Sequence, residues 1–317
     1  MSLILKKKSN YVRRYPKVDR KYGDILGIKV SITTKQEVLD FVRSRLESKE
    51  KFFIVTPNPE NLLLATHDWL LKKAIERSHL SVPDGVGLAM AYKFLNLADD
   101  KHNIFRPLVL LYEGLKIGLL AFRDKGKLTE GFEIIKGREL FIDILEIINS
   151  KKGRVYLFGG ENGEQEQSIK NLKLKFPNIT FQTNYKFPFF NKNGQPVTLS
   201  DRKMHKSILG SIKLFEPDMV FVALNTPKQE KWIFRNLYRL QKVTGAMTVG
   251  GTFNYVAGNM KIPPKWVENL GLEWVYRLIQ EPKRLRRILN AFPIFPWKVF
   301  MWKLNPPTRV KSTIKAK

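Results

Sequence analysis

Two short polar motifs hold the residues whose types best suit acid–base chemistry. The sequence TPNPE occupies residues 56–60, directly after the apolar run at residues 52–55. The sequence PDGVG at residues 83–87 follows a second apolar run at residues 80–82. A carboxylate beside glycines that admit a substrate suits a general base for a hydroxyl group, which makes Asp84 the candidate base. The alternative interpretation is that Asp84 only forms a turn or caps a helix.

A glycine-rich motif, FGGENG at residues 158–163, stands between an expected strand and an expected helix. Glycines in this position let backbone N–H groups approach a phosphate, helped by the positive end of the following helix. We therefore take Gly159 and Gly160 as candidate substrate-binding residues. A plain tight turn explains the same glycines equally well.

Two later motifs also follow expected strands. The sequence NTPKQE at residues 225–230 contains Asn225, Lys228 and Gln229, which could contact a diphosphate or a sugar. Proline and glutamate in the same motif are also ordinary chemistry for the start of a helix. The sequence GGTFN at residues 250–254 adds the candidate binding residues Gly250, Gly251 and Asn254.

The order of the expected elements predicts the fold class. Expected strands at residues 52–55, 80–82, 155–158, 219–224 and 247–249 alternate with expected helices that include residues 61–77, 86–95 and 138–150. Such alternation predicts an α/β fold, a Rossmann-like and mostly parallel sheet with helices on both faces. Ligands of such sheets bind beyond the carboxyl ends of the strands. The motifs above all follow strands, so we expect them to meet at this edge.

The charge distribution predicts an anionic partner. The chain of 317 residues has a formal net charge of +27. Residues 1–22 contribute +7 and residues 277–317 contribute +10, so most of the excess lies at the two ends. Phosphorylated substrates, anionic lipids and nucleic acids all attract such a chain. The chain has no cysteine, which excludes disulfides and thiolate metal sites.

The basic residues near the C-terminus alternate with aromatic ones at positions 292, 295, 297, 300 and 302. This mixture is typical of a segment that lies in the interface of an anionic membrane. The alternative is a solvated basic face whose aromatic residues pack on the domain. The most apolar stretch, residues 107–122, is interrupted by Glu113 and Lys116 and is short for a membrane span. We expect no secretory signal and a cytoplasmic location.

The motifs together resemble the WecG/TagA/CpsF glycosyltransferases, glycosyltransferase family 26. The resemblance covers roughly residues 24–290. Its most specific parts are TPNPE with VPDGVG, then PKQEKW at residues 227–232, then GLEWVYRLIQEPKRLRR at residues 271–287. Their order and spacing make coincidence a poor explanation.

The resemblance implies a Rossmann-like core with a C-terminal appendage and an inverting transfer from a UDP-sugar to a polyprenyl-diphosphate-linked saccharide. It implies that Asp84 is the base and that no metal or other cofactor takes part. It assigns substrate-binding roles to Thr56, Asn58 and Gln229. It also implies that three arginines of the appendage close over the donor diphosphate at the membrane: Arg277, Arg284 and Arg287.

The sequence departs from the family pattern at several points. Residues 96–136 are longer than usual, and Ile134 stands where the family has an arginine, for which Arg138 or Arg123 could substitute. Asn254 replaces the usual aspartate of the GGxFD motif, and Asn225-Thr226 replaces the usual glycine before PKQE. The usual Lys-Arg-Ala-Pro run reads KIPP at residues 261–264. We therefore predict no specific donor sugar for this chain from the resemblance.

We accordingly predict three regions: a flexible basic arm at residues 1–22, a catalytic core at residues 23–270 and a membrane-associating appendage at residues 271–317. Gly85 and Gly87, which follow Asp84 in the core, also belong to the predicted substrate site. The inserted stretch within residues 96–136 is expected to be either a membrane- or acceptor-binding helix or a buried core helix. The oligomeric state stays open.

The predicted function is transfer of a hexose or N-acetylhexosamine-type sugar in the synthesis of a surface polysaccharide, such as exopolysaccharide, capsule or teichoic acid. The predicted partners are the UDP-sugar, the lipid-linked acceptor and the anionic inner face of the plasma membrane. A nucleic-acid-binding protein is the non-enzymatic alternative, but no nucleic-acid-binding motif is present. A nucleotide-dependent oxidoreductase on a similar fold is the second alternative, and it lacks the expected G-x-G-x-x-G.

Overall fold

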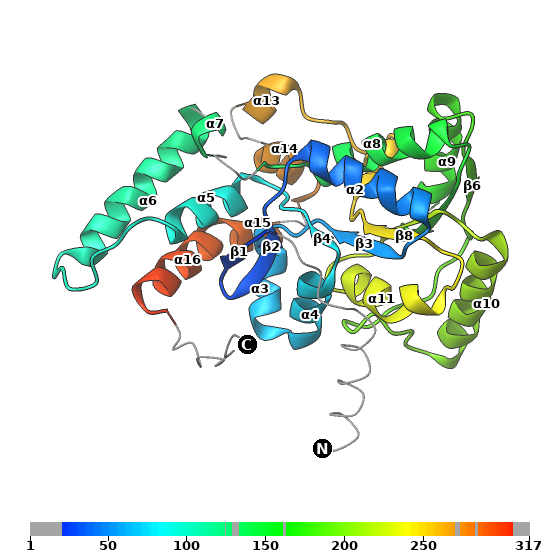
Figure 1. The fold of residues 1–317 in the computed structure, drawn as a ribbon, viewed down its shortest axis with the longest axis horizontal. Helices are drawn as coiled ribbons and strands as arrows, with labels where there is room; N and C mark the ends of the chain where they lie inside the picture. Colours follow the sequence, from blue (N-terminus) through cyan, green and yellow to red (C-terminus); the bar gives the residue numbers. More distant parts are fainter. Residues whose placement is uncertain are drawn as a thin grey trace, which may run out of the picture.

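The structure is a computed structural model that describes residues 21–123, 125–128, 133–160, 163–269, 273–282 and 285–306 (Figure 1). Nearly all of the predicted basic arm at residues 1–22 lies outside the described residues, as do Arg284 and the last residues, 307–317. Within the described ranges, no helix is both long and apolar enough to cross a membrane.

The centre of the fold is a six-stranded sheet in the order β4-β3-β8-β7-β5-β6, and every neighbouring pair is parallel. Two further strands, β1 and β2, form a separate antiparallel hairpin that the sequence did not predict. The strands are β1 Tyr22–Ile25, β2 Ile28–Ser31, β3 Phe52–Val55, β4 Leu80–Ser81, β5 Arg154–Gly159, β6 Thr180–Gln182, β7 Met219–Ala223 and β8 Gly245–Thr248.

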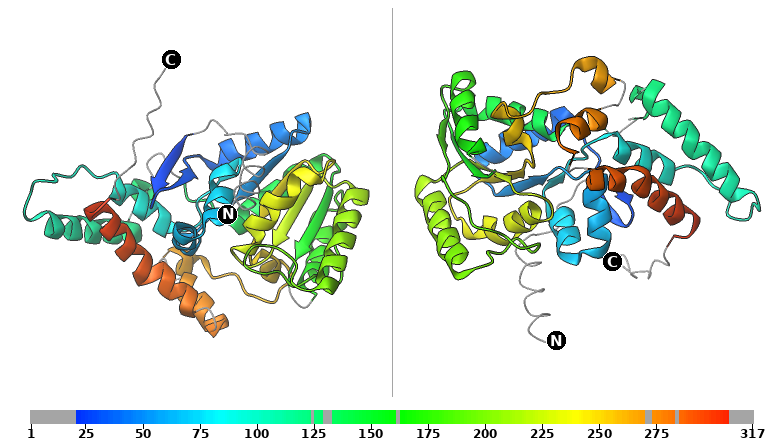
Figure 2. Two further views of the ribbon diagram at one scale, coloured as in Figure 1. Left: turned by 90° about the horizontal axis from the view of Figure 1, so that it is seen from below. Right: turned by 180° about the vertical axis from the view of Figure 1, so that it is seen from behind.

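Helices cover both faces of the sheet, which confirms the predicted fold class (Figures 1 and 2). The helices are α2 Lys35–Ser48, α3 Pro59–His67, α4 Trp69–Arg77, α5 Val86–Leu95, α6 Arg106–Arg123, α7 Lys125–Leu128, α8 Gly137–Ser150, α9 Glu164–Lys175, α10 Leu199–Phe215, α11 Lys228–Asn236, the 3-10 turn η1 Leu237–Arg239, α12 Thr252–Val256, α13 Lys265–Asn269, α14 Glu273–Gln280, α15 Leu285–Leu289, the π-helical turn η3 Asn290–Ile294 and α16 Phe295–Leu304.

Each strand contributes to two core layers because successive side chains point to opposite faces. In β3, Phe52 and Ile54 join the layer formed with α2, α8 and α9. The intervening residues Phe53 and Val55 join the layer formed with α3, α4, α10 and α11. All four side chains are buried, as expected for a parallel sheet covered on both faces.

The helix expected at residues 61–77 is in fact two helices, α3 and α4, so this prediction was wrong in extent. Asp68 separates them, and its carboxylate accepts a hydrogen bond of 3.0 Å from the N–H of Leu71 at the start of α4. The same carboxylate pairs with the buried ammonium group of Lys231 on α11. A polar residue that both caps a helix and meets a buried charge explains the break.

The C-terminal helices lie against the core rather than apart from it. Phe295 and Val299 of α16 are buried in the same cluster as residues of α3 and α5. The ammonium group of Lys303 donates to the carbonyl oxygens of Leu95 and Leu97 at 3.1 and 2.8 Å. The sequence predicted an appendage, and these contacts fix its last described helix to α5.

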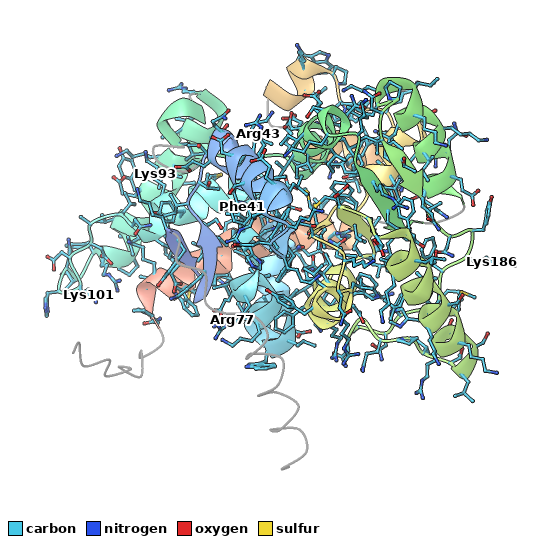
Figure 3. All side chains as sticks on the ribbon, turned by 45° about the vertical axis from the view of Figure 1, so that its right-hand side comes forward. Phe41, Arg43, Arg77, Lys93, Lys101 and Lys186 are labelled. Carbon is cyan, nitrogen blue, oxygen red and sulfur yellow. The ribbon has the colours of Figure 1, made fainter. Side chains whose placement is uncertain are left out.

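Basic side chains occur on many elements of the described fold. Figure 3 labels Arg43 on α2, Arg77 on α4 and Lys93 on α5, together with Lys101 and Lys186 in loops, and these lie on different sides of the molecule. Positive charge alone therefore does not locate a binding face.

The close packing of β8 against its neighbours gives a test of the sheet register. A Cβ atom on Gly245 would lie 2.1 Å from Met219 Sδ and 2.6 Å from the Phe52 ring. We expect Gly245→Ala to lower the free energy of unfolding by about 1–3 kcal/mol through overpacking. Gly210, inside α10, has no atom within 4 Å of such a Cβ. Gly210→Ala should instead raise stability by about 0.5–1 kcal/mol. Urea denaturation of both variants measures this, and similar stability changes would contradict the register.

Candidate active site

Asp84 lies in the loop that joins β4 to α5, at the carboxyl edge of the sheet. Its N–H donates to the carbonyl oxygen of Pro57, at 2.9 Å, in the loop that follows β3. Gly85 has a φ of +95°, a conformation that favours glycine, and it immediately precedes α5. Open space adjoins the Gly85 Cα, since a Cβ atom there would meet nothing within 4 Å. The two predicted motifs therefore meet, with open space beside Gly85.

The segment before α8 completes the surroundings of Asp84. The N–H of Ile135 donates to the carbonyl oxygen of Pro83 at 3.4 Å. The N–H of Gly137 donates to the Asp84 carboxylate. The start of α8 thus follows the PDG loop, although more than fifty residues separate them in the sequence.

Burial and charge set the protonation of Asp84. Loss of hydration is the largest influence and raises the pKa of Asp84 to about 6. The residue keeps some solvent exposure, but its carboxyl group is enclosed by protein atoms. The positive charges of Arg277 and Arg138 lower this pKa, while the negative charge of Glu273 raises it. Asp84 is therefore ionised at neutral pH yet more basic than an ordinary carboxylate.

Two arginines and one tyrosine surround Glu273 on α14. Arg138 Nη1 and Arg277 Nη2 lie 2.9 and 3.3 Å from Glu273 Oε1. Both guanidinium groups lie over the Tyr255 ring, 5.6 and 5.3 Å from its centroid. The Tyr255 hydroxyl and Arg277 Nε are buried and have no hydrogen-bond partner among the described residues.

Thr56 lies next to the same segment. A Cβ atom on Gly137 would be 3.1 Å from Thr56 Oγ1, so Thr56 and Asp84 both adjoin Gly137. The Thr56 N–H donates to Thr248 Oγ1 at 3.3 Å, across from β3 to β8. The structure thus brings Thr56, Asp84 and the end of β8 to one edge of the sheet.

Gln229 makes contacts inside the protein at both ends of its amide. Its oxygen accepts from the Gly250 N–H at 3.1 Å, and its nitrogen donates to Glu230 at 3.0 Å. Gln229 therefore positions the loop after β8 in this structure, and its predicted contact with substrate stays a prediction. Lys228 is half-buried beside it at the start of α11, and Asn225 is exposed in the preceding loop.

The predicted residues Asn58 and Gly87 have local structural roles. The Asn58 side chain accepts from the Asn61 N–H at 3.0 Å and so caps α3. A Cβ atom on Gly87 would be 2.9 Å from Pro59 Cγ, so a glycine is needed for close packing. A substrate role for either residue stays a prediction.

Arg287 reaches the first motif from the appendage. Its Nε lies 2.8 Å from Glu60 Oε2, and Glu60 is the last residue of TPNPE. Arg277 stands beside Asp84, as described above. The third arginine of the prediction, Arg284, lies outside the described residues.

The two later glycine motifs form turns at the ends of strands. Gly160 donates its N–H to the Ala223 carbonyl oxygen at 2.9 Å, and a Cβ atom on Gly159 would be 2.5 Å from that oxygen. These contacts favour the tight-turn interpretation of this motif. The N–H of Asn254 donates to the carbonyl oxygen of Gly251 at 3.2 Å at the start of α12. Phosphate contacts by these residues remain predictions.

Acidic residues elsewhere have structural partners. Asp218, which precedes β7, accepts a hydrogen bond of 2.8 Å from the N–H of Arg154, as expected for a structural turn. Within the described ranges, no group of three or more histidine, aspartate or glutamate side chains could hold a metal ion. A hollow of about 330 Å³ between the loop at residues 97–103 and α6 is remote from Asp84. Its lining includes Asp99, Asp100 and Glu113, which disfavour a diphosphate.

Comparison with known proteins identifies the family. Residues 23–105 and 120–309 match the glycosyl transferase WecG/TagA/CpsF family. The chain belongs to this family. It is therefore a glycosyltransferase, which sets aside the oxidoreductase and nucleic-acid-binding alternatives.

Curated relatives agree with this assignment. The chain is 29% identical over 278 residues to an N-acetylglucosaminyldiphosphoundecaprenol N-acetyl-beta-D-mannosaminyltransferase of Staphylococcus aureus strain MW2, covering 87% of this chain and 91% of the relative. The proteins of the same name from strains NCTC 8325 and MRSA252 are 29% and 28% identical over the same coverage. Members of the WecG/TagA/CpsF family thus include enzymes that act on a lipid-linked acceptor.

The WecG/TagA/CpsF match is interrupted where the structure has most of α6. Residues 106–119 lie outside the matched ranges, whereas the rest of the predicted insertion at residues 96–136 lies inside them, so the insertion stays a prediction. Ile134, at the position of the usual family arginine, packs half-buried against the core. Of the two suggested substitutes, Arg138 stands beside Asp84, whereas Arg123 is exposed at the end of α6.

Sequence reasoning missed two residues of this WecG/TagA/CpsF site, Glu273 and Tyr255. Glu273 lies inside the quoted segment at residues 271–287, and Tyr255 directly follows the GGTFN motif. Four-residue spacing between Glu273 and Arg277 on one helix face was the available signal. Nothing in the sequence indicated that Arg138 would approach the same carboxylate.

The charges around Asp84 give a prediction that needs no assay of activity. We expect the ¹³Cγ resonance of Asp84 to titrate with a midpoint of about 6. Glu273→Gln removes the negative charge that raises this pKa, so the midpoint should move down. Arg277→Gln removes a positive charge and should move it up. Glu146→Gln, on the exposed side of α8, is the control and should leave it unchanged. A midpoint near 4 in the unmodified protein would refute the enclosure of Asp84.

Proposed function

We propose that this protein is an inverting, UDP-sugar-dependent glycosyltransferase in which Asp84 is the general base. The acceptor is a saccharide linked to polyprenyl diphosphate, and the product belongs to a surface polysaccharide. The observation that carries the proposal is the enclosed Asp84 carboxylate at the carboxyl edge of the sheet, which stands beside two guanidinium groups and is followed by Gly85, where there is open space.

The protonation state of Asp84 supports the role of a base. With a pKa of about 6, only roughly one-tenth of the carboxyl groups carry a proton at pH 7. The remaining carboxylates are more basic than a solvated aspartate and so accept a proton more readily. In the proposed step Asp84 takes the proton of the acceptor hydroxyl while that oxygen bonds to the anomeric carbon of the donor. The bond from this carbon to the UDP oxygen breaks, and UDP leaves with the electron pair.

The negative charge that develops on UDP needs stabilisation. Arg277 and Arg138 lie beside Asp84 and share Glu273, and Arg287 pairs with Glu60 at the TPNPE motif. Once Asp84 takes up the acceptor proton, the two arginines outweigh Glu273 by one positive charge. Preorganised charges of this kind stabilise a leaving diphosphate without reorganisation during the reaction.

The names of the relatives suggest the first substrates to test. Those enzymes are N-acetylmannosaminyltransferases that act on N-acetylglucosamine linked to diphosphoundecaprenol. For this chain we propose the same class of acceptor, with UDP-N-acetylmannosamine as the first donor in a panel of UDP-sugars. Attachment to the inner face of the plasma membrane and activity without a metal ion belong to the same proposal.

Substitution of Asp84 tests the proposed base. We expect Asp84→Asn to lower kcat by about 10²–10⁴-fold, because asparagine cannot accept the proton. Release of UDP in the presence of a lipid-diphosphate N-acetylglucosamine acceptor measures this. Asp40→Asn, on the exposed face of α2, is the matched control and should keep full activity. Full turnover by the Asp84→Asn protein would remove Asp84 from the mechanism.

The same assay tests whether arginines of the protein or a bound metal ion stabilise the negative charge on the leaving UDP. If Arg138 and Arg277 supply the charge at the leaving diphosphate, UDP release should be equal in chelator and in magnesium. Replacement of either arginine by glutamine should lower kcat/KM by about tenfold or more. A reaction that stops in chelator and resumes with a divalent ion would contradict this assignment.

A further inference from the structure

The helix α6 is apolar on the side that packs against α5. Leu110, Ile117 and Ala121 are buried there. The helix approaches closely at Gly114, where a Cβ atom would be 3.5 Å from the Phe94 ring. This face accounts for the stability of α6 on the protein, and it fixes the orientation of the helix.

The opposite face of α6 is also apolar, but it is exposed. Leu108, Leu111, Leu115 and Leu119 follow one another at spacings of three, four and four residues, which places them on one stripe, and Ile104 lies in the turn just before the helix. Each has at least half of its side chain exposed, and the value for Leu115 is 66%. A continuous apolar stripe of this length marks an interaction surface rather than ordinary scattered exposure.

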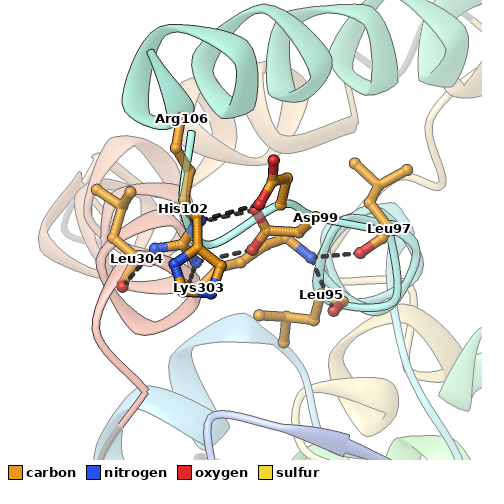
Figure 4. A network of polar contacts seen from close by, with 8 residues as sticks. Leu95, Leu97, Asp99, His102, Arg106, Lys303 and Leu304 are labelled. Carbon is orange, nitrogen blue, oxygen red and sulfur yellow. Dashed lines mark hydrogen bonds and ion pairs between the residues drawn. The ribbon is translucent and has the colours of Figure 1, made fainter. Parts of the chain in front are cut away.

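A polar network holds α6 against the end of α16 (Figure 4). Arg106 donates to both carboxylate oxygens of Asp99, at 2.8 and 2.7 Å. The same guanidinium donates to the carbonyl oxygens of Lys303 and Leu304 at 2.8 and 2.9 Å. The first turn of the inserted helix is therefore tied to the last turn of the C-terminal helix. Any surface that contacts the α6 stripe also lies close to α16.

The helix α16 and the turn before it expose apolar and basic side chains of their own. Phe292, Trp297 and Met301 are exposed, and Lys298 is exposed among them. Residues 285–304 contain four basic residues and no acidic one. Of these, Arg287 pairs with Glu60 and Lys303 is buried, so Lys298 supplies the exposed positive charge among the side chains that the structure describes. Exposed aromatic and aliphatic groups next to such a charge are typical of a segment that lies in the headgroup region of an anionic membrane.

We propose that the exposed stripe of α6 and the exposed side of α16 form one membrane-binding face for an anionic lipid bilayer. This inference rests on the proposed function, and it assigns the membrane contact to an inserted helix that the family match omits. The helix lies in the plane of the bilayer surface, because its other face is buried against α5. Arg123, exposed at the end of α6, adds positive charge, whereas the charge of Lys116 is balanced by Glu113 at 2.8 Å.

Charge favours a lipid surface over a second copy of the chain. Two copies, each with a net charge of +27, would repel one another across a shared α6 face. An anionic bilayer attracts the same charge and buries the same apolar stripe. The membrane therefore satisfies both properties of the surface at once.

The position of this face suits delivery of a lipid-linked acceptor. Figure 1 shows α6 running beside α5 to α7, which lies at the same end of the molecule as α13 and α14. Asp84 lies two residues before the start of α5, and Arg277 belongs to α14. A bilayer held against α6 thus approaches the edge of the proposed active site, where the diphosphate of the acceptor would lie.

The test compares two double variants of the full chain. Leu111→Gln with Leu115→Gln removes the centre of the stripe. Leu174→Gln with Leu214→Gln is the matched control, because both leucines are 86% exposed on α9 and α10, far from α6 (Figure 1). Sedimentation with vesicles of phosphatidylglycerol and phosphatidylcholine measures binding. We expect the α6 variant to lose about tenfold or more in its partition coefficient, and the control to match the original protein.

Two results would overturn the proposal. The first is equal vesicle binding by both double variants. The second is a dimer of the original protein, seen by light scattering, that the α6 variant converts to monomer without loss of vesicle binding. The vesicles contain no donor or acceptor, so this outcome is independent of Asp84 and of UDP release. Vesicle binding therefore tests the membrane-binding face, and UDP release tests the proposed function, so either proposal can be refuted without the other.

Discussion

The proposed site depends on one electrostatic constraint, a carboxylate held out of water among charges of both signs. Removal of water alone would favour the neutral acid of Asp84. Arg138 and Arg277 oppose that effect, and Glu273 limits how far they do so. The resulting pKa of about 6 keeps the carboxylate ionised at neutral pH and still basic. The arrangement suits a base, and once Asp84 has taken up a proton the two arginines outweigh Glu273 by one charge, which can stabilise a departing diphosphate.

This constraint requires distant parts of the chain to meet. Asp84 follows β4, and the start of α8 supplies the Gly137 N–H and the Arg138 guanidinium. The helix α14 supplies Glu273 and Arg277, and α12 supplies the Tyr255 ring beneath both guanidinium groups. The C-terminal helices therefore belong to the electrostatics of the core. Hydrogen bonds from Arg106 to Asp99 and to the Lys303 carbonyl oxygen join the last of these helices, α16, to the inserted α6.

Much of the fold followed from sequence patterns, because buried parallel strands are short apolar runs that end in turn residues. The runs at Phe52–Val55 and Met219–Ala223 were predicted closely for this reason. The hairpin of β1 and β2 was missed. Its strands have only four residues each, which is a weak pattern in the sequence. A contact that holds the hairpin joins residues fifty positions apart, since the N–H of Ser81 in β4 donates to Ser31 Oγ in β2 at 2.9 Å.

The site was predictable in its first element and less so in the others. Asp84 could be chosen from the sequence because it is a carboxylate that directly follows an expected strand and precedes glycines that admit a substrate. Its partners Arg138, Glu273 and Tyr255 depend on the three-dimensional approach of α8, α12 and α14, which no local pattern encodes. Gln229 and Gly160 were chosen by motif, but the structure engages their polar groups with Gly250 and Ala223.

The central claim is that ionised Asp84 accepts the proton in the transfer step. The most direct test is the single-turnover rate of sugar transfer at saturating donor and acceptor, measured between pH 4.5 and 8. The account predicts a rate that rises tenfold per pH unit at low pH and levels off above about pH 6, with this limb absent from the residual rate of Asp84→Asn. A rate that does not change with pH across this range would contradict it.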